Sequence, residues 1–205
     1  ANMVANEMFL DSAVMRNAVA SKAKELGYTP TSSKAAQAQL QITASGSQGS
    51  YTFLPIGTIF KAVDENNNSK TFVNTDVVSF SATGGSGGAT GAVFNVHEGN
   101  LRSVSFVYDA NKNDQKFIVP SNKVDTNHLK VRVQNSSTDG TGFYQPWSLK
   151  SNYAGLSGGS QSYFVQEIDD GRYEVYFGDG LVGKKPNHGN LITIEYLETN
   201  GPEGN

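Results

Sequence analysis

Short runs in which apolar and polar residues alternate recur along this 205-residue chain, and they constrain its fold more than any other feature. Alternation with a period of two places the apolar side chains on one face of a β-strand. The runs 36–43, 101–108 and 128–134 are the most regular, and glycine-rich and other polar stretches separate such runs. Gly, Ser, Thr and Asn favour turns and are poor helix formers. The pattern therefore predicts about ten or more short, mostly antiparallel strands.

One segment near the N-terminus has the helical period instead. Residues 12–26 predict a helix, because Asp11 or Ser12 can cap its start and Gly27 and Pro30 can end it. Its apolar stripe consists of Met15, Val19, Ala23 and Leu26. The predicted fold class is mainly β, in the α+β sense, with one N-terminal helix followed by strands in two small β lobes.

A Gly/Ser-rich stretch at 83–91 predicts a mobile loop or a linker between lobes. It suggests a division of the chain into three parts. Residues 1–44 would carry the helix and the first strand, and residues 45–91 would form a small β lobe that ends in the loop. Residues 92–205 would form the second β lobe.

The composition argues against several classes of protein. The absence of cysteine excludes disulfides, thiolate catalysis, iron–sulfur clusters and cysteine zinc sites. A formal net charge of −3 argues against an electrostatic nucleic-acid binder, which needs a basic face. No apolar run approaches the ~18 residues of a transmembrane helix. We therefore expect no nucleic acid and no membrane as partner. We also expect no cofactor and no small-molecule substrate, because the motifs described next lack the structural context that such sites need.

Residues 178–183 match the dinucleotide-binding pattern G-x-G-x-x-G. That chemistry requires a helix to begin at the glycines, so that its amides hold the pyrophosphate. Here residues 184–186 are Lys-Lys-Pro, which cannot lie inside a helix. The better interpretation is a turn at the end of a strand, in which glycines supply positive φ and Asp179 bonds nearby amides.

Other catalytic and metal-binding patterns fail in the same way. Ser86 and Ser157 each lie in a G-x-S-x-G match, but a nucleophile elbow needs a strand before the serine and a helix after it. Both serines lie in Gly/Ser loops. Residues 109–113 begin like a calcium loop, but Asp114 and Pro120 stand where that loop needs Gly and Glu. We predict no catalytic residue and no metal ligand, so the chain is not expected to be an enzyme.

Tyr144, Trp147 and Tyr153 form an aromatic-rich stretch within a long polar segment. Exposed rings of this kind bind sugars in carbohydrate-binding sandwiches. One alternative is therefore a secreted or surface β-sandwich that binds carbohydrate. The other interpretation is that Trp147 fills a gap between lobes or subunits.

The most specific pattern lies near the C-terminus, where F-G-D-G is followed by glycine and proline at intervals of three. Its residues are Phe177, Gly178, Asp179, Gly180, Gly183, Pro186 and Gly189. Together with Leu-Gly-Tyr at 26–28, Gly-Thr-Ile-Phe at 57–60 and Val-His-Glu-Gly at 96–99, it resembles the baseplate J-like family. It looks most like the wedge-protein branch from contractile-tailed bacteriophages, and the resemblance covers about 7–205.

The resemblance implies a structural virion protein of the phage tail baseplate, without catalytic residues. Such a wedge subunit would assemble with copies of itself, as a dimer or ring, and with other wedge and hub proteins, in particles assembled in the host cytoplasm. We expect its interface to include Met8, Phe9, Leu10, Met15, Val19, Ala23, Leu26 and Trp147. The start at Ala1 and the turn-forming end at 201–205 lead us to expect a piece of a longer protein.

Overall fold

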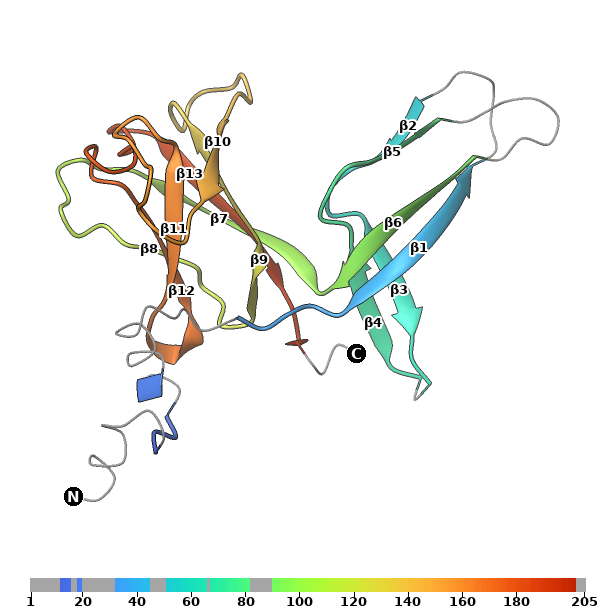
Figure 1. Ribbon diagram of the computed structural model, residues 1–205. Coiled ribbons are helices and arrows are strands. Elements are labelled where there is room, and N and C mark those ends of the chain that lie inside the picture. Colours follow the sequence, from blue (N-terminus) through green and yellow to red (C-terminus); the bar gives the residue numbers. More distant parts are fainter. Residues whose placement is uncertain are drawn as a thin grey trace. The chain divides into compact units, whose positions relative to one another are not determined.

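The computed structural model describes most of the chain, and Figure 1 shows its strands in sequence colours. The described residues are 12–15, 18–19, 32–44, 51–65, 67–81 and 90–201. The chain forms two compact units, of which unit 1 combines Ala1–Ser32 with Ser103–Tyr196, and unit 2 combines Ser33–Arg102 with Leu197–Asn205. The predicted domain boundaries after residues 44 and 91 stay a prediction, because compactness alone does not establish independent folding.

Unit 2 is built on a four-stranded antiparallel sheet in the order β1-β6-β4-β3. Its strands are β1 (Gln37–Ala44), β3 (Ile59–Val63), β4 (Ser69–Val73) and β6 (Thr90–Glu98). A second antiparallel pair consists of β2 (Tyr51–Leu54) and β5 (Val78–Ser81). The strand predicted from the alternation over 36–43 is confirmed, since the glutamines of β1 are exposed while Leu40 and Ile42 are half-buried.

A buried asparagine braces the turn that leads into β3. The side chain of Asn74 is only 1% exposed. Its Oδ1 accepts a hydrogen bond from the Thr58 N–H at 2.7 Å, and its Nδ2 donates to the carbonyls of Pro55 and Asp76, both at 2.9 Å. Gly57, inside this turn, has a φ of +83°, which glycine adopts without steric cost. One side chain therefore fixes the entry of the chain into β3.

Asn74→Ala is expected to lower the free energy of unfolding by about 2 kcal/mol, because it removes three hydrogen bonds made by a buried side chain. Urea titration followed by circular dichroism measures the change. Asn95→Ala is a matched control, since Asn95 lies exposed on β6. The control is expected to change stability by less than about 0.5 kcal/mol. Equal effects of the two substitutions would contradict the bracing role.

Most of unit 1 is a seven-stranded sheet in the order β7-β13-β9-β10-β11-β12-β8. Its strands are β7 (Asn100–Val107), β8 (Phe117–Ile118), β9 (Val124–Gln134), β10 (Gln145–Leu149), β11 (Ser162–Glu167), β12 (Tyr173–Phe177) and β13 (Leu191–Glu198). β10 and β11 run parallel, whereas β9–β10, β11–β12 and β12–β8 are antiparallel. The β11–β12 hairpin turns at Asp170 and Gly171, whose φ values are +64° and +69°.

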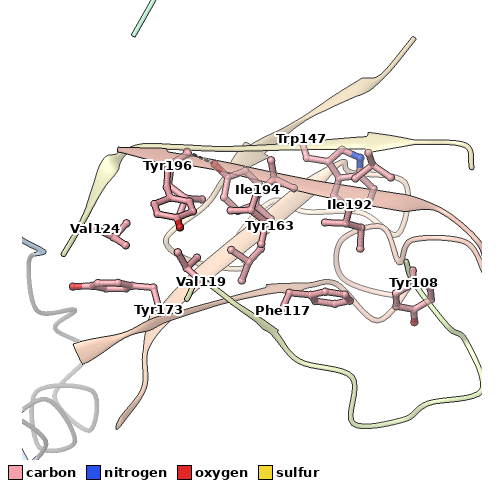
Figure 2. Close-up of a cluster of buried hydrophobic side chains, with 14 residues drawn as sticks. Tyr108, Phe117, Val119, Val124, Trp147, Tyr163, Tyr173, Ile192, Ile194 and Tyr196 are labelled. Carbon is pink, nitrogen blue, oxygen red and sulfur yellow. Dashed lines mark hydrogen bonds between the residues drawn. The ribbon is translucent and has the colours of Figure 1, made fainter. Parts of the chain in front are cut away.

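A cluster of buried aromatic and aliphatic side chains forms the core of unit 1 (Figure 2). Ile192 and Ile194 of β13 lie across this core from Phe117 of β8 (Figure 2). The Phe117 ring contacts the ring of Phe106 in β7, with their centroids 5.5 Å apart. Because β7 and β8 are the two edges of the sheet, the sheet curls around its own core.

The predicted N-terminal helix is wrong for the described part of the chain, and the fold class is mainly β rather than α+β. Among the described residues the longest helical element is a three-residue 3₁₀ turn, η1 (Asp169–Gly171), and within the segment predicted as a helix the described helical residues are 18 and 19. Ser12–Met15 are turn or irregular, with Val14 87% exposed and Met15 43% exposed. Apart from 18 and 19, the rest of the segment predicted as a helix lies outside the described residues. The predicted loop at 83–91 also lies there, except for its last two residues, which belong to β6.

The physical reason for this error lies in the stripe on which the helix was predicted. That stripe is narrow and contains small residues, and a helix of this length is stable in a protein mainly through packing of its apolar face. The exposure of Val14 and Met15 shows that this packing is missing at its start. No helix among the described residues is long and apolar enough to cross a membrane.

Candidate functional site

The turn residues singled out in the sequence run from the last residue of β12 into the segment that follows it, and they begin in the core. Phe177 is the last residue of β12. Its ring packs edge-on against Trp147 of β10, with centroids 5.0 Å apart, and against Phe117 at 5.5 Å. The start of the turn is therefore held by the aromatic core of unit 1.

Beyond Phe177 the chain reverses through a turn that closes on itself. The Gly180 N–H donates to the Gly183 carbonyl at 3.0 Å. The Asp179 carboxylate oxygen Oδ1 accepts from the backbone N–H groups of Leu181 and Val182 at 2.8 and 2.9 Å. This confirms the interpretation of G-x-G-x-x-G as a turn in which the aspartate bonds nearby amides. The sequence continues without a helix, so no helix N-terminus is present to hold a pyrophosphate.

Glycine is required at Gly178 for a different reason from Gly180. A Cβ atom on Gly178 would overlap the backbone of Gly183 and the carbonyl oxygen of Val182. Gly180 instead has a φ of +94° and open space where a Cβ would be. The first glycine therefore permits two backbone segments to meet, and the second permits the chain to turn.

The turn also binds a neighbouring loop. The Gly183 N–H donates to the Ser157 carbonyl at 3.1 Å, and the Lys184 N–H donates to the Ser160 carbonyl at 2.7 Å. Farther along, Pro186 is buried, and the N–H of Gly189 donates to the Tyr108 carbonyl at 2.8 Å. Residues of the pattern thus attach the connection between β12 and β13 to two other segments of unit 1.

The tip of this braced turn presents apolar side chains to solvent. Leu181 is 80% exposed and Val182 is 38% exposed. Hydrogen bonds from the Val182 and Leu181 amides hold the pKa of Asp179 below its ordinary value of 3.8, and the charge of Lys185 acts in the same direction. The Asp179 carboxylate therefore holds the backbone of the tip in place, and the tip presents an exposed leucine side chain.

The brace at Asp179 is expected to stabilise the protein in a pH-dependent way. A carboxylate whose pKa is depressed by folding adds stability above its unfolded pKa and loses it as the pH falls through the folded value. Asp179→Asn should therefore lower the thermal midpoint at pH 7, and the difference from the wild type should shrink below about pH 3.8. Thermal unfolding at a series of pH values measures it. A difference that grows toward acid pH would contradict this role.

The other motif residues do not assemble a catalytic or metal site in the described part of the chain. Asp109 accepts hydrogen bonds from the N–H and the Nδ2 of Asn111 at 3.0 and 3.2 Å, as in an ordinary Asx turn. The Ser157 hydroxyl lies 3.2 Å from that of Ser160, and Ser86 lies outside the described residues. No group of three or more His, Asp or Glu side chains among the described residues could hold a metal ion.

The proposed sugar platform is not assembled. Trp147 is 6% exposed and belongs to the core of unit 1. Tyr144 is 41% exposed and lies under the guanidinium of Arg132, which is 4.5 Å from its ring centroid. Tyr153 packs on Phe164. The tryptophan that would be the centre of the platform is therefore not available to a sugar ring.

The predicted interface residues are only partly described. Met8, Phe9, Leu10, Ala23 and Leu26 lie outside the described residues. Met15 is exposed, Val19 is half-buried and Trp147 is buried in unit 1. The interface on this set stays a prediction.

Sequence reasoning missed a buried carboxylate in unit 2. Glu98 is 3% exposed and accepts three hydrogen bonds, from Thr199 Oγ1 at 2.7 Å and from the Asn200 N–H and Nδ2 at 3.1 and 3.0 Å. The next residue, Gly99, has a φ of +124°, and a Cβ there would overlap the Glu198 carbonyl oxygen. The sequence signal that could have indicated this buried carboxylate is a charged residue directly before a glycine, at the junction of two strands.

Comparison with known proteins gives one informative match. No family model matches the sequence. The chain is 29% identical to the baseplate wedge protein gp6 of Enterobacteria phage T4, in an alignment of 223 positions that covers all of this chain. The chain spans about a third (32%) of the length of that relative. It is therefore similar along its whole length to part of a structural baseplate protein.

Proposed function

We propose that this chain is part of a structural protein of a phage tail baseplate. The observation that carries the proposal is the similarity to the gp6 wedge protein, which extends over the whole chain. The finer proposal is a wedge subunit of a contractile tail, of the baseplate J-like type. The F-G-D-G turn, on which that resemblance depends most, supports it because the turn is a well-braced part of the structure.

The architecture suits a mechanical role. Polar side chains are buried at positions where they join segments distant in sequence, as Glu98 does with Thr199 and Asn200. The core of unit 1 is closed by aromatic contacts between its two edge strands. These features hold backbone segments in fixed positions, as a subunit under load requires. The protein in this proposal is not an enzyme and uses no cofactor.

The proposed partners are copies of this protein and other wedge and hub proteins of the baseplate. The exposed Leu181 at the tip of the braced turn is one candidate contact. The apolar segment at Met8, Phe9 and Leu10 is another. The proposed location is the virion tail, after assembly in the host cytoplasm.

Genetic complementation tests the proposal. A stop codon early in the gene of the full-length protein should abolish plaque formation, and electron microscopy of the lysate should show particles without baseplates. Wild-type protein supplied from a plasmid should restore both. Normal plaques and complete tails without the protein would overturn the assignment.

A further inference from the structure

Strand β1 forms one edge of the sheet in unit 2 (Figure 1). All of its residues, Gln37–Ala44, pair with β6 on one side. On the other side, no strand in the described ranges pairs with it. It is thus an eight-residue strand with a complete ladder on one edge and an open ladder on the other.

The register shows which backbone groups face the open edge. The Glu98 N–H donates to the Ala36 carbonyl at 2.8 Å, so Ala36 is a bonded position of the β1–β6 ladder. Bonded and non-bonded pairs alternate along an antiparallel ladder. Every second residue from Gln37 onward therefore directs its N–H and C=O away from β6. These residues are Gln37, Gln39, Gln41 and Thr43.

The other sheet edges in the described part of the chain carry the usual protection against pairing with another strand. Natural edge strands are short, charged, interrupted by proline or covered. β3 has Lys61 at its centre, β8 has two residues, and β2 and β5 have four each. On β7, the Val107 carbonyl accepts a bond from Gln115 Nε2 at 2.7 Å, and Arg102 adds a charge. β1 differs, since QAQLQITA contains no charge, proline or glycine.

The apolar face of β1 is incompletely covered as well. Leu40 lies opposite Phe94 of β6 and Ile42 lies opposite Ala92, yet both residues of β1 are only half-buried. A neighbouring strand on the open side would cover them and would satisfy the outward backbone groups at the same time.

We propose that β1 pairs with β1 of a second copy of this chain, antiparallel about a two-fold axis at Leu40. This inference rests on the self-association that is part of the proposed function, and it assigns that contact to the open edge of β1. Pairing about this axis keeps the polar face and the apolar face of the two strands in register. Polar residues of one copy lie opposite polar residues of the other, and apolar residues lie opposite apolar residues. The resulting pairs are Leu40 with Leu40, Gln39 with Gln41, Ala38 with Ile42 and Gln37 with Thr43.

The residues of β1 suit a second copy as the partner. Like charges directly opposite each other destabilise a strand pair, and β1 contains no charge, so pairing with an identical strand has no such penalty. A partner strand with charged residues would gain no ion pair on β1. The two sheets would join into one continuous sheet, with β1 and its symmetry mate at the centre.

Lysine substitutions at the open edge test the proposal without touching the core. Gln39→Lys combined with Gln41→Lys places like charges opposite each other in the proposed pair. We expect the 205-residue chain to form a concentration-dependent dimer in analytical ultracentrifugation, and the double variant to raise the dissociation constant at least tenfold. Ser79→Lys with Ser103→Lys is the matched control, because both serines are exposed on other strands. Circular dichroism should show that both variants fold.

A cysteine scan tests the register. The chain has no cysteine, so a single introduced cysteine can form a disulfide only between copies. Residues opposite each other at a non-bonded pair have Cα atoms about 4.5 Å apart, within the range for a disulfide. Among single cysteines at 38–42, Leu40→Cys should cross-link most under mild oxidation, and Ser79→Cys should not exceed background.

A monomer at every concentration would overturn the inference. So would a dimer that the edge lysines leave unchanged, since the contact would then lie elsewhere, or cross-linking of Leu40→Cys no stronger than that of Ser79→Cys. None of these results bears on plaque complementation, which tests the baseplate assignment separately.

Discussion

Gly178→Ala is expected to lower the free energy of unfolding of unit 1 by about 3 kcal/mol, at the upper end for an extra methyl group in a packed site. The added Cβ would overlap the backbone of Gly183 and the carbonyl of Val182, and backbone cannot move aside as a flexible side chain can. Relief of the overlap would also pull on the hydrogen bonds from the turn to Ser157 and Ser160. Trp147 reports the effect, because it is the only tryptophan and contacts Phe177 directly.

Gly180→Ala is the matched control for this experiment. Gly180 has a φ of +94° but open space around its Cβ position, so alanine there brings only the backbone strain, about 1 kcal/mol. Denaturant titration followed by tryptophan fluorescence measures both variants. Equal losses of stability would show that the close approach at Gly178 does not limit the turn.

Glu98→Ala is expected to lower the free energy of unfolding of unit 2 by about 3 kcal/mol or more. The carboxylate accepts one bond from Thr199 and two from Asn200, and bonds to a charged acceptor are stronger than neutral ones. Removing it leaves these donors without their acceptor in a site where Thr199 is only 2% exposed. The end of β13 should lose its attachment to β6.

Hydrogen exchange locates the loss, with fast exchange expected at the amides of Asn200 and Gly201. The control is Arg102→Ala, which removes the Arg102–Glu198 pair nearby. The arginine side chain of that pair is 58% exposed, so its loss should cost less than about 1 kcal/mol. If Glu98→Ala were as mild as this control, the buried carboxylate would not hold the chain end.

The strands of this protein were predictable from its sequence, and the helix was not. Alternation over 36–43 and 128–134 fixed β1 and β9, because a strand needs only one apolar face and that face is visible as a period of two. The helix prediction used an equally visible period of 3.6. It failed because the exposed Val14 and Met15 lack the packing that stabilises a helix.

The candidate site was predictable where its signal is local. The turn at Gly178–Gly183 follows from glycine spacing and one aspartate, all within six residues. The buried roles of Asn74 and Glu98 could not be predicted, because their partners are distant or are backbone groups. A single sequence shows a polar residue in the same way whether it is exposed or buried. The parallel pairing of β10 with β11 was hidden for a similar reason, since it depends on the path of the loop between them.

A cryo-electron microscopy map of the intact phage particle tests the central claim most directly. We expect both units of this chain to fit density in the baseplate, at the end of the tail, in several symmetry-related copies. Density for the chain in the capsid or the tail tube, or its absence from purified particles, would contradict a structural role in the baseplate.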